Sequence, residues 1–265
     1  MTIDIASNVA TTEQFDEDPE VRWEIASATL RQLIAVVGDL RTAVGLSFRS
    51  DGLHVQTMDA SHACCVCVHL QEASFEDYTC TSPVSLGLQL ASLAEVLAEC
   101  GPDASLVGHW QSGSSAVSLQ HLRSSGDGIA SSLLELVRTE IEYVDVPELR
   151  YSSAACVPAG ELLQLCRALT VAGGLVEVSG FHDELVIRAP GHAQSRLVLP
   201  SSQWAELPVV AQFSLKLFTG FAETAPQPSI VQLRISPGTP LSVQYICGAS
   251  GGGTAQFHLV PLAAV

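Results

Sequence analysis

The sequence is poor in basic charge and has almost no lysine. Twelve Lys and Arg residues stand against 28 Asp and Glu residues, which gives a formal net charge of −16, and Lys216 is the single lysine. A strongly acidic protein repels nucleic acid and anionic membrane over most of its surface. Any contact with nucleic acid therefore needs a local basic face, which the total charge does not exclude.

Long apolar runs are also missing. No run approaches the roughly 20 residues that a membrane-spanning helix requires, so we expect no membrane contact. Residues 1–20 are polar and acidic, with no basic residue and without the apolar core of a secretory signal. We expect these residues to form a disordered acidic tail.

Cys64 and Cys67 have C-x-x-C spacing, but no second cysteine cluster completes a zinc-ligand set. We therefore expect no metal and no cofactor, and reduced thiols of a cytosolic or nuclear protein that act as small core side chains. The eight cysteines are Cys64, Cys65, Cys67, Cys80, Cys100, Cys156, Cys166 and Cys247.

Hydrophobic residues make up 47% of the 265 residues, enough for a well-packed core. Apolar spacing predicts more strands than helices, joined by tight turns such as Ser50-Asp51-Gly52. This pattern is typical of an α+β protein in which antiparallel sheets carry paired helices on one face. Helices are expected at residues 28–44, 89–99, 159–171 and 213–223, and residues 129–142 fit either a helix or a strand.

The chain contains an internal repeat. Residues 30–55 match residues 162–187 with a constant offset of 132, and residues 98–120 match residues 222–244 with a constant offset of 124. Two sustained registers without internal gaps indicate a duplicated unit.

The repeat suggests two similar domains at residues 21–140 and 152–265. Between them, residues 141–151 form an extended connector, because Pro147 disfavours helix at the residue before it.

The segment 53–62 reads Leu-His-Val-Gln-Thr-Met-Asp-Ala-Ser-His. Its alternating first half predicts a strand, and the loop that follows holds Met58 and His62 before the apolar strand at residues 63–70. Loops between strands often carry binding residues. The alternative is an ordinary turn with a buried methionine.

Several segments together resemble the eukaryotic sliding clamps of the proliferating cell nuclear antigen family. The resemblance rests on residues 40–70 with the Gln-Thr-Met-Asp-Ala-Ser-His segment, and on residues 90–93, 146–151, 160–169 and 240–245. It runs from Trp23 to the C-terminus. It implies two clamp-type domains per chain, with sheets outside, helices inside, and chains joined head to tail in a homotrimeric ring.

The resemblance also implies a function. Such rings encircle duplex DNA in the nucleus, are placed there by a clamp loader, and tether DNA polymerases and replication or repair proteins without being enzymes. The alternative is a divergent relative that acts in a heteromeric checkpoint-type ring or binds polymerase without encircling DNA.

By the same resemblance, the joint between subunits would pair the strand Ala116–Leu122 of one chain with residues 194–199 of the next. The expected interface residues are Ala116, Val117, Ser118, Leu119, Gln194, Arg196, Leu197 and Val198.

The partner pocket of the family lies between the connector and the second domain. His258 stands where the family usually carries an aromatic residue, so partner preference is expected to differ. The matching positions are Met58, Ser61, His62, Val144, Val146, Pro147, Tyr151, Pro240, His258, Val260 and Pro261.

The lumen departs most from the family, which normally has a basic one. The four expected helices carry four cations against five carboxylates, and Glu95 and Glu223 stand where the family has lysines. The expected DNA contacts are Arg31, Arg41, Arg167 and Lys216. His182 takes the place of the modified lysine of the family, so attachment of a ubiquitin-like protein is not expected there.

Two patterns suggest enzymes of another class, a serine or thiol hydrolase. Gly248-Ala-Ser250-Gly-Gly252 fits the G-x-S-x-G elbow, which requires a helix after it, whereas residues 254–259 predict a strand. Cys64, Cys65 and Cys67 lie on one predicted strand, whose successive side chains point to opposite faces. Both patterns favour ordinary sheet structure, and no enzyme is expected.

Overall fold

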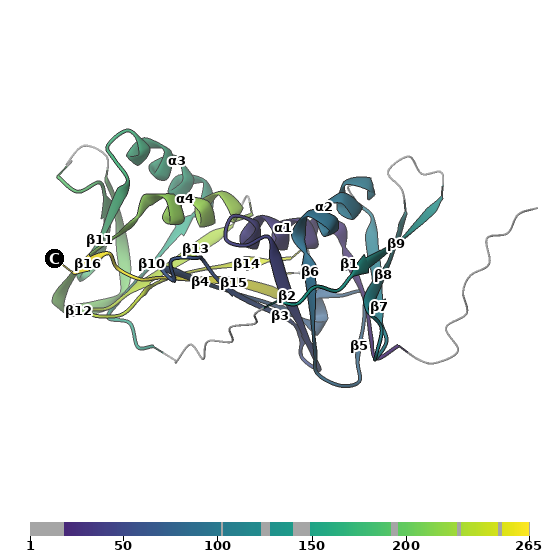
Figure 1. Ribbon diagram of the computed structural model, residues 1–265. Coiled ribbons are helices and arrows are strands. Elements are labelled where there is room, and N and C mark those ends of the chain that lie inside the picture. The colour runs from purple at the N-terminus through teal and green to yellow at the C-terminus, as the bar shows by residue number, and fades with distance from the viewer. Residues whose placement is uncertain are drawn as a thin grey trace, which may run out of the picture.

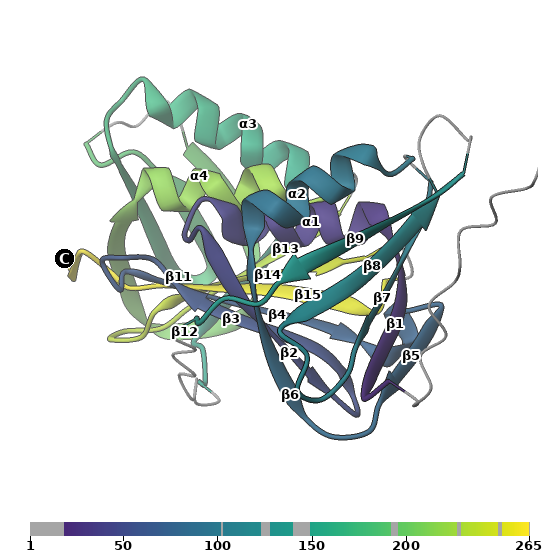
Figure 2. The same cartoon turned by 45° about the vertical axis from the view of Figure 1, so that its right-hand side comes forward.

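The computed structural model describes residues 19–101, 103–122, 128–139, 149–191, 196–226, 229–248 and 251–264. The predicted connector residues Val144, Val146 and Pro147, most of the acidic tail, Gln194 and Ser250 lie outside these ranges. The remaining chain folds into antiparallel sheets that carry four α-helices on one side (Figures 1 and 2), as the α+β prediction requires.

The first half of the chain builds a five-stranded sheet and half of a larger one. The five-stranded sheet has the order β5-β1-β7-β8-β9. Its strands are β1 (Val21–Ala26), β5 (Asp77–Cys80), β7 (Ser105–Trp110), β8 (Ala116–Leu122) and β9 (Ile129–Glu135).

The eight-stranded sheet joins the two halves of the chain, with the order β10-β13-β14-β15-β4-β3-β2-β6. The first half supplies β2 (Ala43–Arg49), β3 (Gly52–Met58), β4 (Cys64–Gln71) and β6 (Val84–Gln89); the second supplies β10 (Ser153–Pro158), β13 (Ile230–Ile235), β14 (Leu241–Cys247) and β15 (Gly253–Leu259). β4 and β15 meet in an antiparallel pair that runs from Leu70 opposite Gly253 to Cys64 opposite Leu259. This pair is the internal joint of the chain.

The third sheet has the order β11-β12-β16. β11 (Leu175–Arg188) and β12 (Arg196–Ser214) are long strands, and β16 (Ala263–Ala264) adds a short edge. The pairing of β11 with β12 is interrupted around His182. With the offset of 132 residues, β11 covers the positions of both β2 and β3. Arg188 Nε donates to Glu177 Oε1 at 2.7 Å, so β11 folds back on itself around His182 as the β2–β3 hairpin does.

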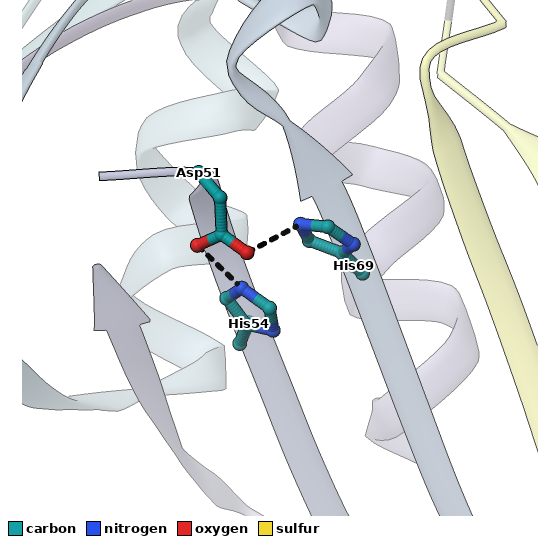
Figure 3. A group of neighbouring side chains, drawn as sticks. All are labelled: Asp51, His54 and His69. Atoms are coloured by element: carbon teal, nitrogen blue, oxygen red, sulfur yellow. Dashed lines mark hydrogen bonds and ion pairs between the residues drawn. The ribbon is translucent and has the colours of Figure 1, made fainter. Parts of the chain in front are cut away.

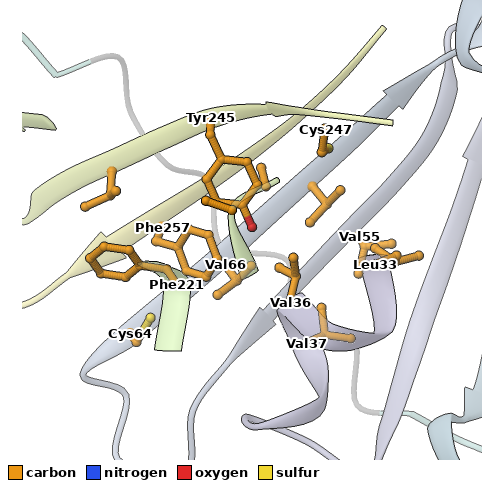
Figure 4. Packing of buried hydrophobic residues seen from close by; sticks show 14 of the residues in the cluster. Leu33, Val36, Val37, Val55, Cys64, Val66, Phe221, Tyr245, Cys247 and Phe257 are labelled. Carbon is orange, nitrogen blue, oxygen red and sulfur yellow. The ribbon is translucent and has the colours of Figure 1, made fainter. Parts of the chain in front are cut away.

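The four helices are α1 (Ser27–Gly38), α2 (Leu90–Glu99), α3 (Ala159–Thr170) and α4 (Leu215–Thr224), and a 3₁₀ turn, η1 (Glu72–Ser74), follows β4. Their apolar stripes pack on the inner faces of the sheets. Where the halves meet, Phe221 of α4 lies 5.3 Å from Phe257 of β15, and the Tyr245 ring lies 6.0 Å from Phe257 between ring centres (Figure 4). One core therefore continues across the internal joint.

Within the described ranges, none of the helices has the length and apolar character needed to cross a membrane.

One prediction of local structure was wrong, and two strands had not been assigned. The helix expected at residues 28–44 ends at Gly38, because residues from Ala43 onward pair with β6 as β2. The ambiguous segment 129–142 contains the strand β9, and β5 was not predicted, since its four residues show too short an alternation to stand out.

Gly108 offers a direct test of packing in the five-stranded sheet. It lies opposite Trp23, and a Cβ atom at Gly108 would overlap the Trp23 indole, which is stacked on Phe48 with 4.6 Å between ring centres. We expect Gly108→Ala to lower the free energy of unfolding by about 1–3 kcal/mol, measured by urea denaturation. Gly174→Ala is the control, since a Cβ there meets nothing within 4 Å; equal stability of both variants would contradict the packing described.

Candidate functional site

The outer face of the eight-stranded sheet brings several of the predicted partner-binding residues into one row. Met58 lies opposite Cys65, Cys65 lies opposite His258, and His258 lies opposite Ser242. Directly opposed residues of neighbouring strands have Cβ atoms about 4.5–5.5 Å apart and point to the same face. Met58 and His258, 200 residues apart in the sequence, therefore belong to one surface that crosses the internal joint.

The loop between β3 and β4 is held by Asp59. Its carboxylate accepts hydrogen bonds from the backbone N–H of Ser61 at 3.1 Å, from the Ser61 hydroxyl, and from the backbone N–H of Cys64 at 2.6 Å. Partial burial acts to raise the pKa of Asp59, but these hydrogen bonds outweigh it and leave the pKa lowered. The ionised carboxylate thus fixes the loop, and Ser61 and His62 are exposed at its surface.

His258 is a buried polar side chain whose hydrogen bonding is incomplete. The side chain is 7% exposed, and its Nδ1 atom has no hydrogen-bond partner among the described residues. Burial, together with the nearby charge of Arg234, lowers the pKa of His258, so the imidazole is neutral at neutral pH. A neutral imidazole can donate or accept a hydrogen bond, so His258 keeps one unsatisfied polar atom buried beneath this surface.

Tyr151 and Arg234 close one end of the row. Arg234 lies opposite Ser242, donates hydrogen bonds to Ser242 Oγ at 3.2 Å and to Gln244 Oε1 at 2.9 Å, and sits over the Tyr151 ring at 5.2 Å from its centre. Such a cation–π contact orients both side chains. Tyr151 is thereby placed beside the row that contains His258.

Apolar residues of the C-terminal segment border the β3–β4 loop. The backbone N–H of Val260 donates to the carbonyl of Ala63 at 2.9 Å, which ties this segment to the loop. Val260 is 47% exposed and Leu262 is 56% exposed, while Pro240 and Pro261 are half-buried. Apolar groups bordered by polar ones are typical of a docking surface for a peptide.

Two cavities flank this surface. One of about 890 Å³ lies among α1, α4 and the β3–β4 loop and is lined in part by Ser61 and Leu262. A smaller one of about 210 Å³ is lined by Met58, Arg41 and Arg138, among others. The predicted pocket residues in the described ranges thus lie on neighbouring surfaces and not in a single cavity.

The helix side of the molecule carries the predicted DNA contacts. Arg31, Arg167 and Lys216 are exposed. They belong to α1, α3 and α4, which lie on the same side of the sheets (Figure 1). Arg31 Nη2 also donates to the carbonyl of Cys100 at 3.2 Å, where a cation at the end of α2 is favourable. The four helices carry these three cations and the four carboxylates Glu95, Glu99, Glu161 and Glu223.

Arg41 is not a helix residue, which corrects its predicted placement in the lumen. It follows α1, and its Nε atom donates to the carbonyl of Met58 at 2.7 Å. Arg41 therefore supports the end of β3, and its placement with the phosphate-facing residues on a helix was wrong.

The predicted subunit joint needs a similar correction. β8, with Ala116, Val117, Ser118 and Leu119, is an interior strand that pairs with β7 on one side and β9 on the other. An interior strand has no free backbone groups to offer a second chain. Among the described residues, β9 is the outer strand of this sheet, and it exposes Ile129 (73%) and Leu133 (74%).

In the second half, the N-terminal part of β12 is open on one side. Within the described chain, Arg196, Leu197 and Val198 pair with β11 only, and Val198 is 41% exposed. Sequence reasoning missed β9 as the outer strand of this sheet. The repeat contained a signal for it, because the offset of 124 residues maps β9 onto β15, the strand that pairs with β4 inside the chain.

The hydrolase patterns fall in sheet structure. The G-x-S-x-G segment connects β14 to β15, so a strand follows it where the elbow requires a helix. Cys64 faces the core, and burial raises its pKa to about 12, which makes it a poor nucleophile. His182 stands in the irregular part of β11 with a φ of 53° and stacks on Phe181.

Comparisons with known proteins agree with this architecture. Residues 20–143 match the family model described as proliferating cell nuclear antigen, N-terminal domain. The chain is 25% identical over 235 residues to a Dictyostelium discoideum protein named proliferating cell nuclear antigen. The alignment covers 83% of this chain and 91% of that protein. A crystal structure of proliferating cellular nuclear antigen from Entamoeba histolytica superposes with a TM-score of 0.80 at 22% identity, over 93% of this chain and 100% of the other. The chain has the clamp fold, and its first half, residues 20–143, belongs to the family of the proliferating cell nuclear antigen N-terminal domain.

Proposed function

We propose that the protein is a DNA sliding clamp, a non-enzymatic processivity factor whose copies join head to tail in a homotrimeric ring around duplex DNA in the nucleus. In this proposal residues 21–140 and 152–265 are the two clamp domains, residues 141–151 connect them and residues 1–20 are an acidic tail. A clamp loader places the ring on DNA, and polymerases and replication or repair proteins dock on the outer face.

The observation that carries the proposal is that the internal joint can be repeated between chains. Inside the chain, β15 pairs with β4. The offset of 124 residues relates β15 to β9, and the offset of 132 residues relates β4 to residues 196–203 of β12. Among the described residues, β9 and this part of β12 each have an open edge. Open edges of matching length favour strand pairing between copies.

The internal register, transferred by the same offsets, gives a specific joint. It places Leu133 of one chain opposite Val198 of the next and Glu135 opposite Arg196. The first pair would cover two of the large apolar side chains that the single chain exposes, and the second brings opposite charges together. Both pairs also lie on the same face of their strands, as a correct register requires.

A ring is supported by the head-to-tail character of this joint. The edge at β9 differs from the edge at β12, so each added copy leaves the same pair of ends open until the circle closes. Because all four helices lie on one side of the sheets (Figure 2), they would face the same side in every copy. That side would line the opening.

The helix face supports only weak, phosphate-based contact with DNA. Arg31, Arg167 and Lys216 are its cations, and four carboxylates oppose them. This excess of carboxylates over cations on the helices favours the second candidate function, a divergent relative in a heteromeric checkpoint-type ring or a polymerase-binding protein that does not encircle DNA.

Mass in solution and retention on DNA separate the two candidates. A species of three 28.0 kDa chains by light scattering that stays on closed circular duplex and slides off linear duplex supports the clamp. A monomer at all concentrations, or a mass of three chains that appears only with other subunits, would support the alternative.

Reversing two carboxylates on the helix face should reveal its contact with DNA. Each phosphate contact contributes about −0.9 to the slope of log affinity against log salt. We expect Glu95→Lys with Glu223→Lys to raise affinity for a short duplex and to steepen that slope by about two contacts, measured by fluorescence anisotropy. Glu72→Lys with Glu184→Lys changes the net charge equally on η1 and β11; an equal gain in that control would contradict a DNA-facing helix side.

A further inference from the structure

Three side chains with metal-ligating atoms converge on the outer face at the tip of the β2–β3 hairpin, a region used by none of the surfaces above. Asp51 belongs to the turn, His54 to β3 and His69 to β4 (Figure 3). The register of β3 with β4 puts His54 directly opposite His69. The hairpin turn then folds Asp51 back over the same face.

The ligand atoms are close to one another. His54 Nε2 lies 3.0 Å from Asp51 Oδ1, His69 Nε2 lies 3.7 Å from Asp51 Oδ2, and one ligand atom from each residue lies within 4.8 Å of the others. Four ligands placed tetrahedrally about 2.0–2.1 Å from a zinc ion would be roughly 3.3 Å apart. The two measured spacings lie on either side of that value.

The three side chains are partly exposed, although the His69 Nε2 atom is itself shielded from solvent. The side chains of His54, His69 and Asp51 are 26%, 31% and 58% exposed, so an ion could enter and keep a water ligand. His69 Nε2 makes no hydrogen bond among the described residues. The two imidazole rings are stacked at 4.1 Å with 17° between their planes, and a rotation of these half-exposed rings out of the stack is what a shared ion requires.

We propose that Asp51, His54 and His69 form a binding site for a divalent transition-metal ion, with Zn²⁺ as the best fit and water as the fourth ligand. Two imidazoles and a carboxylate are a ligand set that zinc accepts. An ion held there would link the hairpin turn to β4 and stabilise this end of the sheet. The site is independent of the proposed clamp function.

The backbone around the site is already fixed. The Tyr78 hydroxyl donates to the carbonyls of Arg49 at 2.6 Å and Gly52 at 2.9 Å, on both sides of Asp51, and the backbone N–H of Glu72 donates to the Asp51 carbonyl at 3.1 Å. A rigid scaffold of this kind positions ligands before the ion arrives.

The test is a Zn²⁺ titration of the chelator-treated full-length protein, followed by competition with a zinc-binding dye. We expect one high-affinity equivalent per chain, and at least tenfold weaker binding in His54→Ala and in His69→Ala. His62→Ala is the matched control, because His62 is exposed at the opposite end of β3 and β4 and should leave the affinity unchanged. Circular dichroism establishes that each variant is folded.

A Co²⁺ spectrum gives a second, independent outcome. Coordination by nitrogen and oxygen produces d–d bands without a thiolate charge-transfer band, whereas coordination by Cys65 or Cys67 would produce that band. The proposal is overturned if the wild-type protein binds no Zn²⁺ at 100-µM concentrations, if the double His54→Ala/His69→Ala variant keeps the full affinity, or if the charge-transfer band appears.

Discussion

Replacing Leu133 with aspartate is expected to break the proposed ring into single chains of 28.0 kDa. Leu133 is 74% exposed on the open strand β9, and in the transferred register it meets Val198 of the next chain. The change removes about 1.5–3 kcal/mol of apolar burial and places a charge in the contact, so each joint should weaken by about 100-fold or more. Light scattering over a concentration series measures the mass.

The control and the rescue test the register as well as the assembly. Ile246→Asp makes a similar change at a 50% exposed residue of β14, which is paired on both sides, and should leave the mass unchanged. Glu135→Arg should weaken the joint and Arg196→Glu added to it should restore the mass. An unchanged mass for Leu133→Asp, or an Arg196→Glu addition that restores nothing, would contradict the proposed pairing.

The sequence predicted much of the fold because its signals were local. Apolar spacing predicted α2, and the helices expected from the repeat and the resemblance match α3 and α4 to within two residues. The Ser50-Asp51-Gly52 turn predicted the β2–β3 hairpin. The end of α1 was misplaced because Val44 continues the apolar spacing of the helix although its backbone pairs with Leu88 of β6. Sheet pairing, which periodicity does not report, decided that boundary.

The strand order of the five-stranded sheet was the main failure. β8 and β9 both alternate, and alternation shows which face of a strand is buried but not whether its edges are paired. The missing information was in the repeat: the offset of 124 residues maps Leu133 onto Phe257 of β15, a strand of the internal joint. Comparing the two halves of the chain strand by strand would have identified the open edge.

The candidate site was predicted in part for a related reason. Met58 and His258 could be placed together only through the resemblance, since their proximity depends on β4 pairing with β15. The cluster of Asp51, His54 and His69 had a sequence signal that was not used: in the β3–β4 pairing, residues equally distant from the loop face each other. Ligand spacing along the chain alone did not reveal it.

The second large effect is expected on peptide binding at the outer face. Val260→Asp should weaken the binding of a labelled C-terminal peptide of a DNA polymerase, which presents apolar or aromatic side chains on one helical turn, by about 30-fold or more. Val260 is an exposed apolar residue beside the Met58–His258 row, and loss of a central anchor costs about 2 kcal/mol or more. Fluorescence anisotropy with the assembled protein measures the affinity.

We expect His258 to influence which peptides this surface prefers. Its neutral imidazole is buried with Nδ1 unpaired among the described residues, which costs about 1–3 kcal/mol. A peptide that opens the site and brings a hydrogen-bonding group to Nδ1 gains an interaction, whereas one that covers it with an apolar ring leaves the atom unsatisfied. His258→Phe should therefore strengthen purely aromatic peptides and weaken hydrogen-bonding ones. Ile230→Asp, at a 55% exposed residue of β13, is the matched control for both variants. The docking surface would lie elsewhere if Ile230→Asp lost as much affinity as Val260→Asp. The same conclusion would follow if His258→Phe changed the affinity of both peptide classes equally.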